Sequence, residues 1–179
     1  MFELQPALTG KLLRLRPLVS ADFDALYAVA SDPLLWEQHP AWDRYKRDVF
    51  SKLFDESLAS GGALVAEEVG SGKLIGSSRY WGYDEAASEV EIGWSFLARE
   101  YWGGRYNREM KRLMLTHAFR FVNQVVFMIG PKNIRSQRAI EKIGAVPAGT
   151  RRNALGQENL AFVITREGFQ SGPLSSPEG

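Results

Sequence analysis

The stretch "EIGWSFLAREYWGGRYNREM", from Glu91 to Met110, decides the fold. Its first part reads as a half-buried strand, and two adjacent glycines, Gly103 and Gly104, separate this strand from an amphipathic segment. Glycine adopts positive φ without steric cost and lets a bulky group come close. A helix that begins after the glycines would point unpaired N–H groups at the junction, so the junction predicts an anion site.

The segments on either side extend this pattern. Apolar residues after the junction share one helical stripe, formed by Met110, Leu113, Met114, His117, Ala118 and Phe121. The apolar run "QVVFMIG" follows as a strand. The chain from Val90 to Ile129 therefore predicts a strand, a helix and a second strand, with the two strands parallel and the crossover right-handed.

Upstream, the alternating run "KLLRLRPL" predicts a strand that stops at Pro17. Ser20 is expected to cap a helix over "ADFDALYAVA", and a second helix is expected from Arg44 to Leu58. From Gly61 the runs "GGALVAEEVG", "KLIGSSRYWGYD" and "SEVEIGWSFLA" predict a three-strand meander. The "GSGK" between the first two lacks the flanking residues of a phosphate-binding P-loop and predicts a hairpin turn.

Downstream, a short helix is expected to start at an Asn133 cap and to stop at Gly144. The run "ENLAFVITREGF" predicts a last strand. A chain of 179 residues with 45% hydrophobic content fits one domain, placed at residues 10–170. Residues 171–179 have the composition of a disordered tail.

Composition restricts the classes of function. A net charge of +1 gives no general attraction to nucleic acid or to an anionic membrane. The chain has no cysteine and 2 histidines, which excludes thiolate zinc sites and a histidine-rich metal centre. Neither a signal peptide nor an apolar run of about 20 residues is present, so the cytoplasm is the expected location.

The run "EIGWSFLAREYWGGRYNREMKRLMLTHAF", followed by "VVFMIGPKNIRSQRAIEKIGAV", resembles the coenzyme A core of the GNAT superfamily of acyl-CoA N-acyltransferases. It is closest to the branch that contains the ribosomal-protein N-terminal acetyltransferases. The likeness runs from "LLRLRPL" to about Phe169. It implies an α+β fold, with a mixed, mostly antiparallel twisted sheet, a central parallel pair of splayed strands, and helices on both faces.

The resemblance also implies acetyl-CoA as co-substrate and no metal. In the family, a splayed strand pairs with the pantetheine arm, which here implicates Trp94, Ser95 and Phe96. The loop and helix N-terminus that hold the pyrophosphate correspond to Tyr101, Trp102, Gly103, Gly104, Arg105, Tyr106, Asn107 and Arg108. The second motif adds Asn133 and Ser136.

The sequence departs from the family pattern at the junction. Arg105 stands where a small residue is usual, and Asn107 and Arg108 replace a small residue and a threonine that often follow. A bulky cation at position 105 would either crowd the coenzyme phosphates or clamp them through a charge-assisted hydrogen bond. Both alternatives remain open from the sequence.

Acylation of an amine by a thioester needs a neutral amine, stabilisation of the oxyanion and a proton for the departing thiolate. Strand alternation puts Glu89 and Glu91 on one face of the strand, together with Gly93 and Ser95. The opposite face carries Val90, Ile92, Trp94 and Phe96. Glu91 matches the acidic position of the family motif and is the expected base, acting directly or through water. Apart from the resemblance, Glu89 and Glu91 also fit a solvated strand face.

The tyrosine that donates the proton in many family members falls at Ile140, whereas the serine of the N-terminal acetylating branch falls at Ser136. The Ser136 hydroxyl would meet either the coenzyme sulfur or a carbonyl one turn back. Asn133 can act as a helix cap alone, and His117 fits a core histidine better than a catalytic one. Four aromatics fit the core or the acceptor wall equally: Trp36, Trp42, Trp81 and Tyr83.

The resemblance therefore predicts an N-acetyltransferase that moves an acetyl group from acetyl-CoA to a primary amine by direct attack in a ternary complex. The acceptor partner would be a small molecule or a peptide, including a protein N-terminus. Monomer and homodimer are both open. The rival prediction is an acyl-CoA-binding module of the same fold without turnover, and a nucleic-acid-binding protein fits the near-zero net charge poorly.

Overall fold

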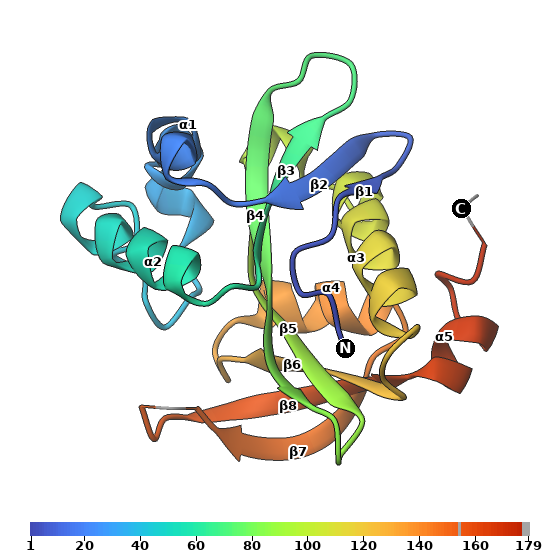
Figure 1. Ribbon diagram of the computed structural model, residues 1–179. Helices are drawn as coiled ribbons and strands as arrows, with labels where there is room; N and C mark the ends of the chain where they lie inside the picture. The colour runs from blue at the N-terminus through green and yellow to red at the C-terminus, as the bar shows by residue number, and fades with distance from the viewer. Residues whose placement is uncertain (154, 177–179) are drawn as a thin grey trace.

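The computed structural model describes residues 1–153 and 155–176, which form a mixed sheet with helices on both faces (Figure 1). The strands are β1 (Leu8–Thr9), β2 (Leu13–Pro17), β3 (Ala63–Glu68), β4 (Leu74–Asp84), β5 (Glu89–Leu97), β6 (Gln124–Ile129), β7 (Val146–Arg152) and β8 (Glu158–Thr165). The α-helices are α1 (Phe23–Ala30), α2 (Arg47–Ala59), α3 (Arg105–Ala118), α4 (Ile134–Lys142) and α5 (Arg166–Ser171).

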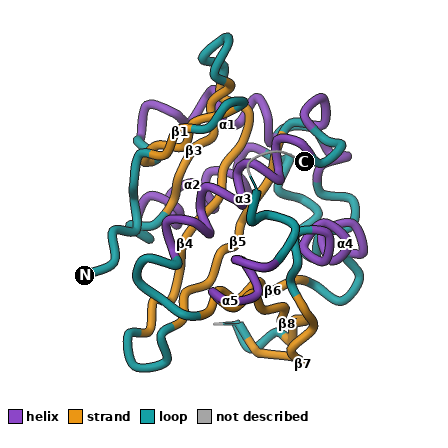
Figure 2. Tube along the Cα trace, turned by 90° about the vertical axis from the view of Figure 1, so that its right-hand side faces the viewer, coloured by secondary structure: helices purple, strands orange, loops and turns teal. Residues whose placement is uncertain are grey.

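The strand order is β1-β2-β3-β4-β5-β6-β8-β7, so strands from the two ends of the chain lie at opposite ends of the sheet (Figure 2). Every neighbouring pair is antiparallel except β5 and β6, which are joined through α3. Their parallel pairing covers only Glu89–Glu91 against Gln124–Val126. Beyond Glu91, β5 pairs with β4 alone, and the predicted splayed pair and α+β fold are confirmed.

The two faces of the sheet carry separate cores. Figure 1 shows α1 and α2 on one side of the sheet and α3 on the other. Met110, Met114 and Leu115 of α3 pack with residues of the central strands in one buried cluster. Phe50 and Phe54 of α2 pack in a second cluster with residues of α1 and β3. We call these sides the α3 face and the α1/α2 face.

A β-bulge divides β5 at Trp94. Its register against β4 shifts between the pairs Arg79↔Gly93 and Ser77↔Phe96, and Trp94 has a φ of 51°. This left-handed conformation is unusual for a residue with a bulky side chain. Because the extra residue changes the alternation, Trp94 and Phe96 pack on the α1/α2 face, although Ile92 lies in the α3 core. The sequence prediction of strand faces is therefore wrong beyond Gly93.

Glu109 of α3 fastens the beginning of β2 to the helix. Its carboxylate accepts hydrogen bonds from the backbone N–H groups of Lys11, Leu12 and Leu13 at 2.8, 2.7 and 2.9 Å. Position 10 is a glycine for a steric reason, since a Cβ there would come within 2.4 Å of the Glu109 carboxyl carbon. One buried carboxylate thereby satisfies three amides from the N-terminal part of the chain.

Two local predictions need correction. Ser20 does not cap α1, because residues 20–22 form a 3₁₀ turn in which the Asp22 carboxylate accepts from Val19 N at 2.9 Å. The final strand ends at Thr165 rather than at Phe169, and Thr165 Oγ1 accepts from Gly168 N at 3.0 Å to begin α5. A local side-chain cap thus competes successfully with continuation of the strand.

The C-terminal region contains further structure that the sequence did not predict. Strand β7 forms the edge of the sheet although it contains Pro147 and Gly149, because an edge strand tolerates a missing donor and a bulge. Leu174, within the segment expected to be a disordered tail, is 1% exposed and lies in the α3-face core. The last part of that segment, residues 177–179, lies outside the described residues.

Candidate active site

The glycine junction leaves the N-terminus of α3 open. Gly103 and Gly104 have φ values of 106° and 103°, and a Cβ on either would meet no atom within 4 Å. Gly104 is the N-cap of α3 and has no side chain with which to cap the first turn. The first N–H groups of the helix therefore face an uncrowded turn, and this geometry suits the phosphates of a coenzyme.

The side chains of the junction divide into two groups. Tyr101 and Tyr106 direct their hydroxyls to Glu68, at 3.3 and 3.1 Å, and Arg108 donates to the carbonyl of Pro173. Their side chains are thus committed to the protein. Arg105 is exposed and Asn107 is half-buried. Of the two arginines placed here by the sequence, Arg105 is the one whose side chain extends to solvent.

Trp102 contacts both the C-terminal end of β5, which does not pair with β6, and α4. Its indole Nε1 donates to the carbonyl of Leu97 at 2.9 Å, and the Arg135 guanidinium lies 4.4 Å from the ring centroid. The loop, the strand end and the helix are therefore held together by protein contacts. A coenzyme would meet a site whose walls are already in place.

Glu91 has a half-buried carboxylate without a close partner. No hydrogen bond or ion pair to its side chain occurs within the described part of the chain. Burial raises the pKa of Glu91 to about 7, an effect that the charges of Arg79 and Arg151 oppose. A carboxylate with this pKa is suited to act as a general base near neutral pH.

Glu89, two residues earlier on β5, has the opposite environment. Its carboxylate accepts from Arg151 of β7 at 2.5 and 3.1 Å and from Gln124 at 2.5 Å. The bond from the Arg151 guanidinium is the main cause that holds the pKa of Glu89 below its usual value. The structure thus separates the two glutamates that the sequence placed together, because Glu89 is ion-paired and Glu91 is not.

The surroundings of Glu91 lie on the α1/α2 face. Gly93 leaves room for the carboxylate, since a Cβ there would come within 3.2 Å of Glu91 Oε1. Arg79 of β4 lies opposite Gly93 in register and stacks on Trp94, with its guanidinium carbon 4.2 Å from the ring centroid. Trp94 also contacts Trp81 edge-on at 6.2 Å. The bulge therefore builds an aromatic and cationic wall beside the candidate base.

Lys111 lies on the α3 face, beneath the half of β5 that does not pair with β6. The sequence patterns did not identify it. It is 2% exposed, its ammonium donates to Ser95 Oγ, and this hydroxyl is 2.7 Å from Ser78 Oγ. Burial lowers the pKa of Lys111 to about 7, and no carboxylate among the described residues pairs with it. The available signal was its spacing from Leu115 and Ala118, which puts a lysine on the buried face of α3.

Asn133 and Ser136 lie at the start of α4. Asn133 is 8% exposed, and its side chain accepts from Ser136 N at 3.2 Å, which confirms the predicted cap. The Ser136 hydroxyl makes no hydrogen bond to a carbonyl one turn back within residues 1–153 and 155–176. It is half-buried and remains available to a ligand.

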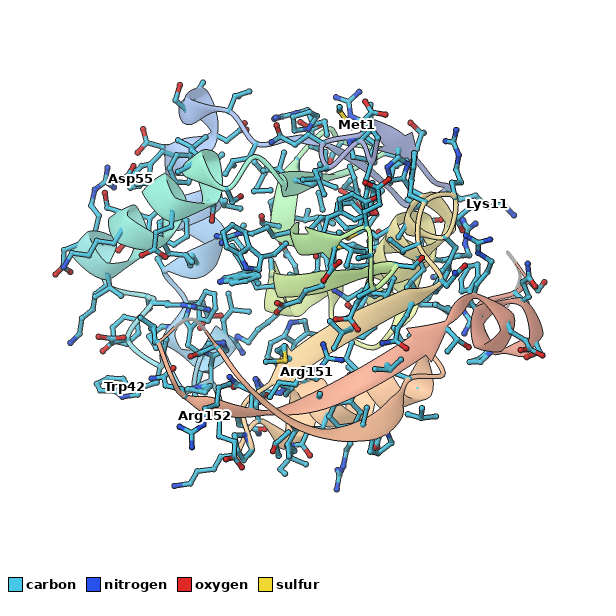
Figure 3. All side chains as sticks on the ribbon, turned by 60° about the horizontal axis from the view of Figure 1, so that its bottom comes forward. Met1, Lys11, Trp42, Asp55, Arg151 and Arg152 are labelled. Carbon is cyan, nitrogen blue, oxygen red and sulfur yellow. The ribbon has the colours of Figure 1, made fainter. Side chains whose placement is uncertain are left out.

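The remaining aromatic residues and His117 divide into core residues and exposed residues. Trp36 is a core residue whose Nε1 donates to Ala30 O at 2.8 Å, whereas Trp42 is 56% exposed and points away from the body of the molecule (Figure 3). Trp81 is exposed and Tyr83 is half-buried. His117 is a core residue, as predicted, with its Nε2 2.7 Å from Glu3 O.

Comparison with known proteins gives the family. The model of the acetyltransferase (GNAT) domain matches residues 13–146, which contain the bulged strand, the glycine junction and the Asn133 cap. The chain belongs to the GNAT acetyltransferase family. No curated protein matches the chain significantly.

Solved structures share the fold at low sequence identity. A probable GNAT acetyltransferase from Chromobacterium violaceum aligns with a TM-score of 0.81 and 22% identity, over 92% of this chain and 88% of that one. RimJ from Mycobacterium smegmatis, in complex with CoA-disulfide, aligns with a TM-score of 0.73 and 18% identity, over 98% and 95%. A putative ribosomal-protein-serine acetyltransferase from Vibrio cholerae aligns with 0.73 and 12%, over 92% and 99%.

The described residues contain neither a metal-binding cluster nor a membrane-spanning helix. No group of three or more histidine, cysteine, aspartate or glutamate side chains is arranged there to hold a metal ion. The helices of the same residues include none with the length and hydropathy of a membrane span.

Proposed function

We propose that the protein is an N-acetyltransferase that uses acetyl-CoA to acetylate a primary amine. Family membership supports acyl transfer, and the half-buried carboxylate of Glu91, which has no hydrogen-bond or ion-pair partner among the described residues, is the observation that carries the assignment of a catalytic base. A binding module without turnover would have no need for an unpaired carboxylate in this position. The salt bridge that would have favoured such a module occurs at Glu89 instead.

The residues present fit the coenzyme. The open N-terminus of α3 would hold the pyrophosphate with Gly103 and Gly104, and Arg105 would add a cation. The backbone of Trp94, Ser95 and Phe96, which β6 leaves unpaired, would hold the pantetheine arm. Bound acetyl-CoA would supply an activated acyl carbon and a thiolate leaving group, so that a carbon–nitrogen bond forms as the carbon–sulfur bond breaks.

The side chains of the chain would manage the protons. Glu91 would accept a proton from the acceptor ammonium, directly or through water, and thereby provide the neutral amine. Because its pKa is about 7, Glu91 is largely ionised above that pH, and the rate should rise as the pH increases through 7. Ser136 would donate a proton toward the departing sulfur, since its hydroxyl has no partner one turn back.

The experiment has two arms. Calorimetry with purified protein should show acetyl-CoA binding with micromolar affinity and competition by free coenzyme A. A panel of peptides, polyamines, amino acids and aminoglycosides should then reveal an acetylated product by mass spectrometry. Binding without any product would favour the acyl-CoA-binding module, and the absence of binding would overturn the coenzyme assignment itself.

A further inference from the structure

Two arginines and a histidine gather on the α1/α2 face beside Glu91. Arg79 comes from β4, whereas His39 and Arg44 come from the segment between α1 and α2. That segment reaches the ends at which β5 and β6 diverge. A Cβ on Gly130, after β6, would strike Pro40 at 2.5 Å, and Trp36 contacts Phe96 of β5 with ring centroids 5.2 Å apart. Gln38 also accepts from the backbone of α4. We call Arg79, His39 and Arg44 the cationic cluster.

Arg79 is buried with part of its guanidinium unsatisfied. It is 5% exposed, and its Nε is buried without a hydrogen-bond partner in the described structure. One other guanidinium nitrogen donates to Ser57 Oγ, and the flat face rests on Trp94. Buried polar atoms are nearly always paired in proteins, so Arg79, which lines a cavity of about 10 Å³, keeps one donor free for an acceptor.

His39 and Arg44 present two donors to each other. The Nδ1 atom of His39 accepts from Ala41 N at 2.9 Å, which leaves the ring hydrogen on Nε2 of the neutral imidazole. Burial and the Arg44 charge lower the pKa of His39 to about 3, so the ring is neutral at physiological pH. Its Nε2 lies 3.2 Å from Arg44 Nη1, so in this tautomer two N–H groups face each other.

The charge of the cluster is also uncompensated at short range. Among the described residues, neither Arg79 nor Arg44 forms an ion pair, and Glu56, Asp43 and Glu91 act on them only through space. Burial lowers the pKa of each arginine to about 10, and in Arg44 the charge of Arg79 adds to this effect. An unpaired guanidinium is costly when buried, as Arg79 is, and the planar donors of Arg79 and of the half-buried Arg44 suit a carboxylate.

The cluster adjoins the candidate base. Arg79 is directly opposite Gly93, and Glu91 Oε1 lies over Gly93 on the same face. Leu53, Phe54 and Trp94 line the narrow cavity next to Arg79. A ligand bound on this face would meet Glu91 as a proton acceptor and the donors of the cationic cluster, with apolar side chains beside them.

From this arrangement we propose that the acceptor is a small amino acid-like molecule with a carboxylate beside its primary amine. Arg79 and Arg44 bind the carboxylate, and Glu91 takes the proton from the ammonium. The amine nitrogen then forms the amide bond as the carbon–sulfur bond of the thioester breaks. The second proton that the nitrogen loses passes to the thiolate, so that coenzyme A leaves as the thiol. The proposal rests on the transfer activity proposed above, and it disfavours a protein N-terminus without a nearby carboxylate.

The test uses L-amino acids paired with their carboxamides, with acetyl-CoA as the fixed co-substrate. For wild-type protein, kcat/KM for the acid should exceed that for the amide by roughly 10–100-fold. Arg79→Gln and Arg44→Gln should each remove most of this preference. Because the Arg79 charge also opposes the rise in the pKa of Glu91, the readout is the ratio of acid to amide and not the rate with the amide alone. Comparing the ratio between variants cancels the intrinsic difference in reactivity between the two amines.

Arg47→Gln is the matched control, because Arg47 is an exposed arginine of α2 that pairs with Asp24. It should keep the full preference, and melting temperatures should show that all variants fold. Peptides that begin with Glu or Gln form a further arm, and a preference for the Glu peptides alone would move the carboxylate to a protein substrate and overturn the small-molecule assignment. Equal rates for acid and amide in wild type would overturn the proposal while leaving acetyl transfer intact.

A binding measurement separates this proposal from the proposed function. Calorimetry in the presence of coenzyme A should show heat of binding for the amino acid and none for its carboxamide. The heat with the amino acid should disappear in Arg79→Gln. If no amine is acetylated but this difference persists, the carboxylate site stands and the transfer activity fails. Absence of both the binding difference and the kinetic preference overturns the carboxylate site.

Discussion

The first half of β5, from Glu89 to Glu91, pairs with strands on both sides, whereas the half beyond Gly93 pairs with β4 alone. In the first half, Glu89 is satisfied by an ion pair and a hydrogen bond. In the second half, Trp94 adopts a left-handed conformation and backbone groups on one side face no strand. The first half therefore stabilises the sheet. The second half, which we call the incomplete half, leaves backbone groups free for the coenzyme proposed above.

Glu91 lies at the boundary between the halves, so its replacement should have the largest effect. Glu91→Gln keeps the size of the side chain and removes its basicity, and kcat should fall by roughly 10²–10⁴-fold. The rise of the rate with pH near 7 should disappear with it, because that rise follows ionisation of Glu91. Steady-state kinetics from pH 5.5 to about 9 would measure both effects.

Glu89→Gln is the matched control for this comparison. It should retain the rate and lose about 1 kcal/mol of stability or less, since the pair with Arg151 is partly exposed. Because the pKa of Glu89 is lowered in the folded state, the pair stabilises above the ordinary glutamate pKa and is lost as the pH falls. A wild-type rate in Glu91→Gln, or an equal loss in both variants, would contradict the division of roles.

Lys111 lies on the α3 face of the incomplete half, where its ammonium donates to Ser95 Oγ. Its pKa is lowered in the folded state, so the unfolded chain binds a proton more readily between the ordinary lysine pKa and about 7. The free energy of unfolding should therefore fall as the pH decreases through this range. Lys111→Met should remove this pH dependence and stabilise the protein by about 1–4 kcal/mol near neutral pH. Urea denaturation at several pH values measures the slope, and destabilisation by methionine would show that the ammonium is well compensated.

Ser136 lies in the first turn of α4, beside the Asn133 cap. Ser136→Ala should lower kcat by about 10-fold and change coenzyme affinity little, if the hydroxyl supplies the proton to the sulfur. Parallel measurement of kcat and of acetyl-CoA binding tests this split. A lower melting temperature with unchanged kinetics would assign the serine to helix stability instead.

Arg105 tests the proposed phosphate end of the site, which a coenzyme bound as proposed would keep far from the reacting carbon. Arg105→Gly should raise KM for acetyl-CoA by about 10-fold, with less effect at high salt, and should leave kcat within about a factor of two. The 3′-dephospho coenzyme locates the contact, because the penalty should vanish with it if the ribose phosphate is the partner. An unchanged KM with both forms would show that Arg105 remains in solvent.

Sequence patterns were sufficient for the strand-helix-strand unit, the meander and the Asn133 cap. These features depend on local periodicity and on caps that lie within a few residues. The bulge at Trp94 was not predictable in this way, because its residue type gives no warning of a left-handed backbone. The extra residue of the bulge places Trp94 and Phe96 on the α1/α2 face and not on the face that strand alternation predicted.

The candidate site shows the same limit. Glu91 was singled out from the resemblance, but its contrast with Glu89 depends on Arg151, which lies on a strand that the sequence did not predict. Pro147 and Gly149 concealed that strand, because they read as turn residues and are tolerated only at an edge. Long-range partners of this kind cannot be read from spacing along the chain.

The attachment of Glu109 to the start of β2 has a consequence for amide exchange. The N–H groups of Lys11, Leu12 and Leu13 share one acceptor on α3, the helix whose first turn forms the proposed phosphate site. They should exchange with deuterium as one unit, since opening any of them requires the helix and the N-terminal strand to separate. If coenzyme binding steadies α3, the protection of these three amides will report it from a part of the chain that does not touch the coenzyme.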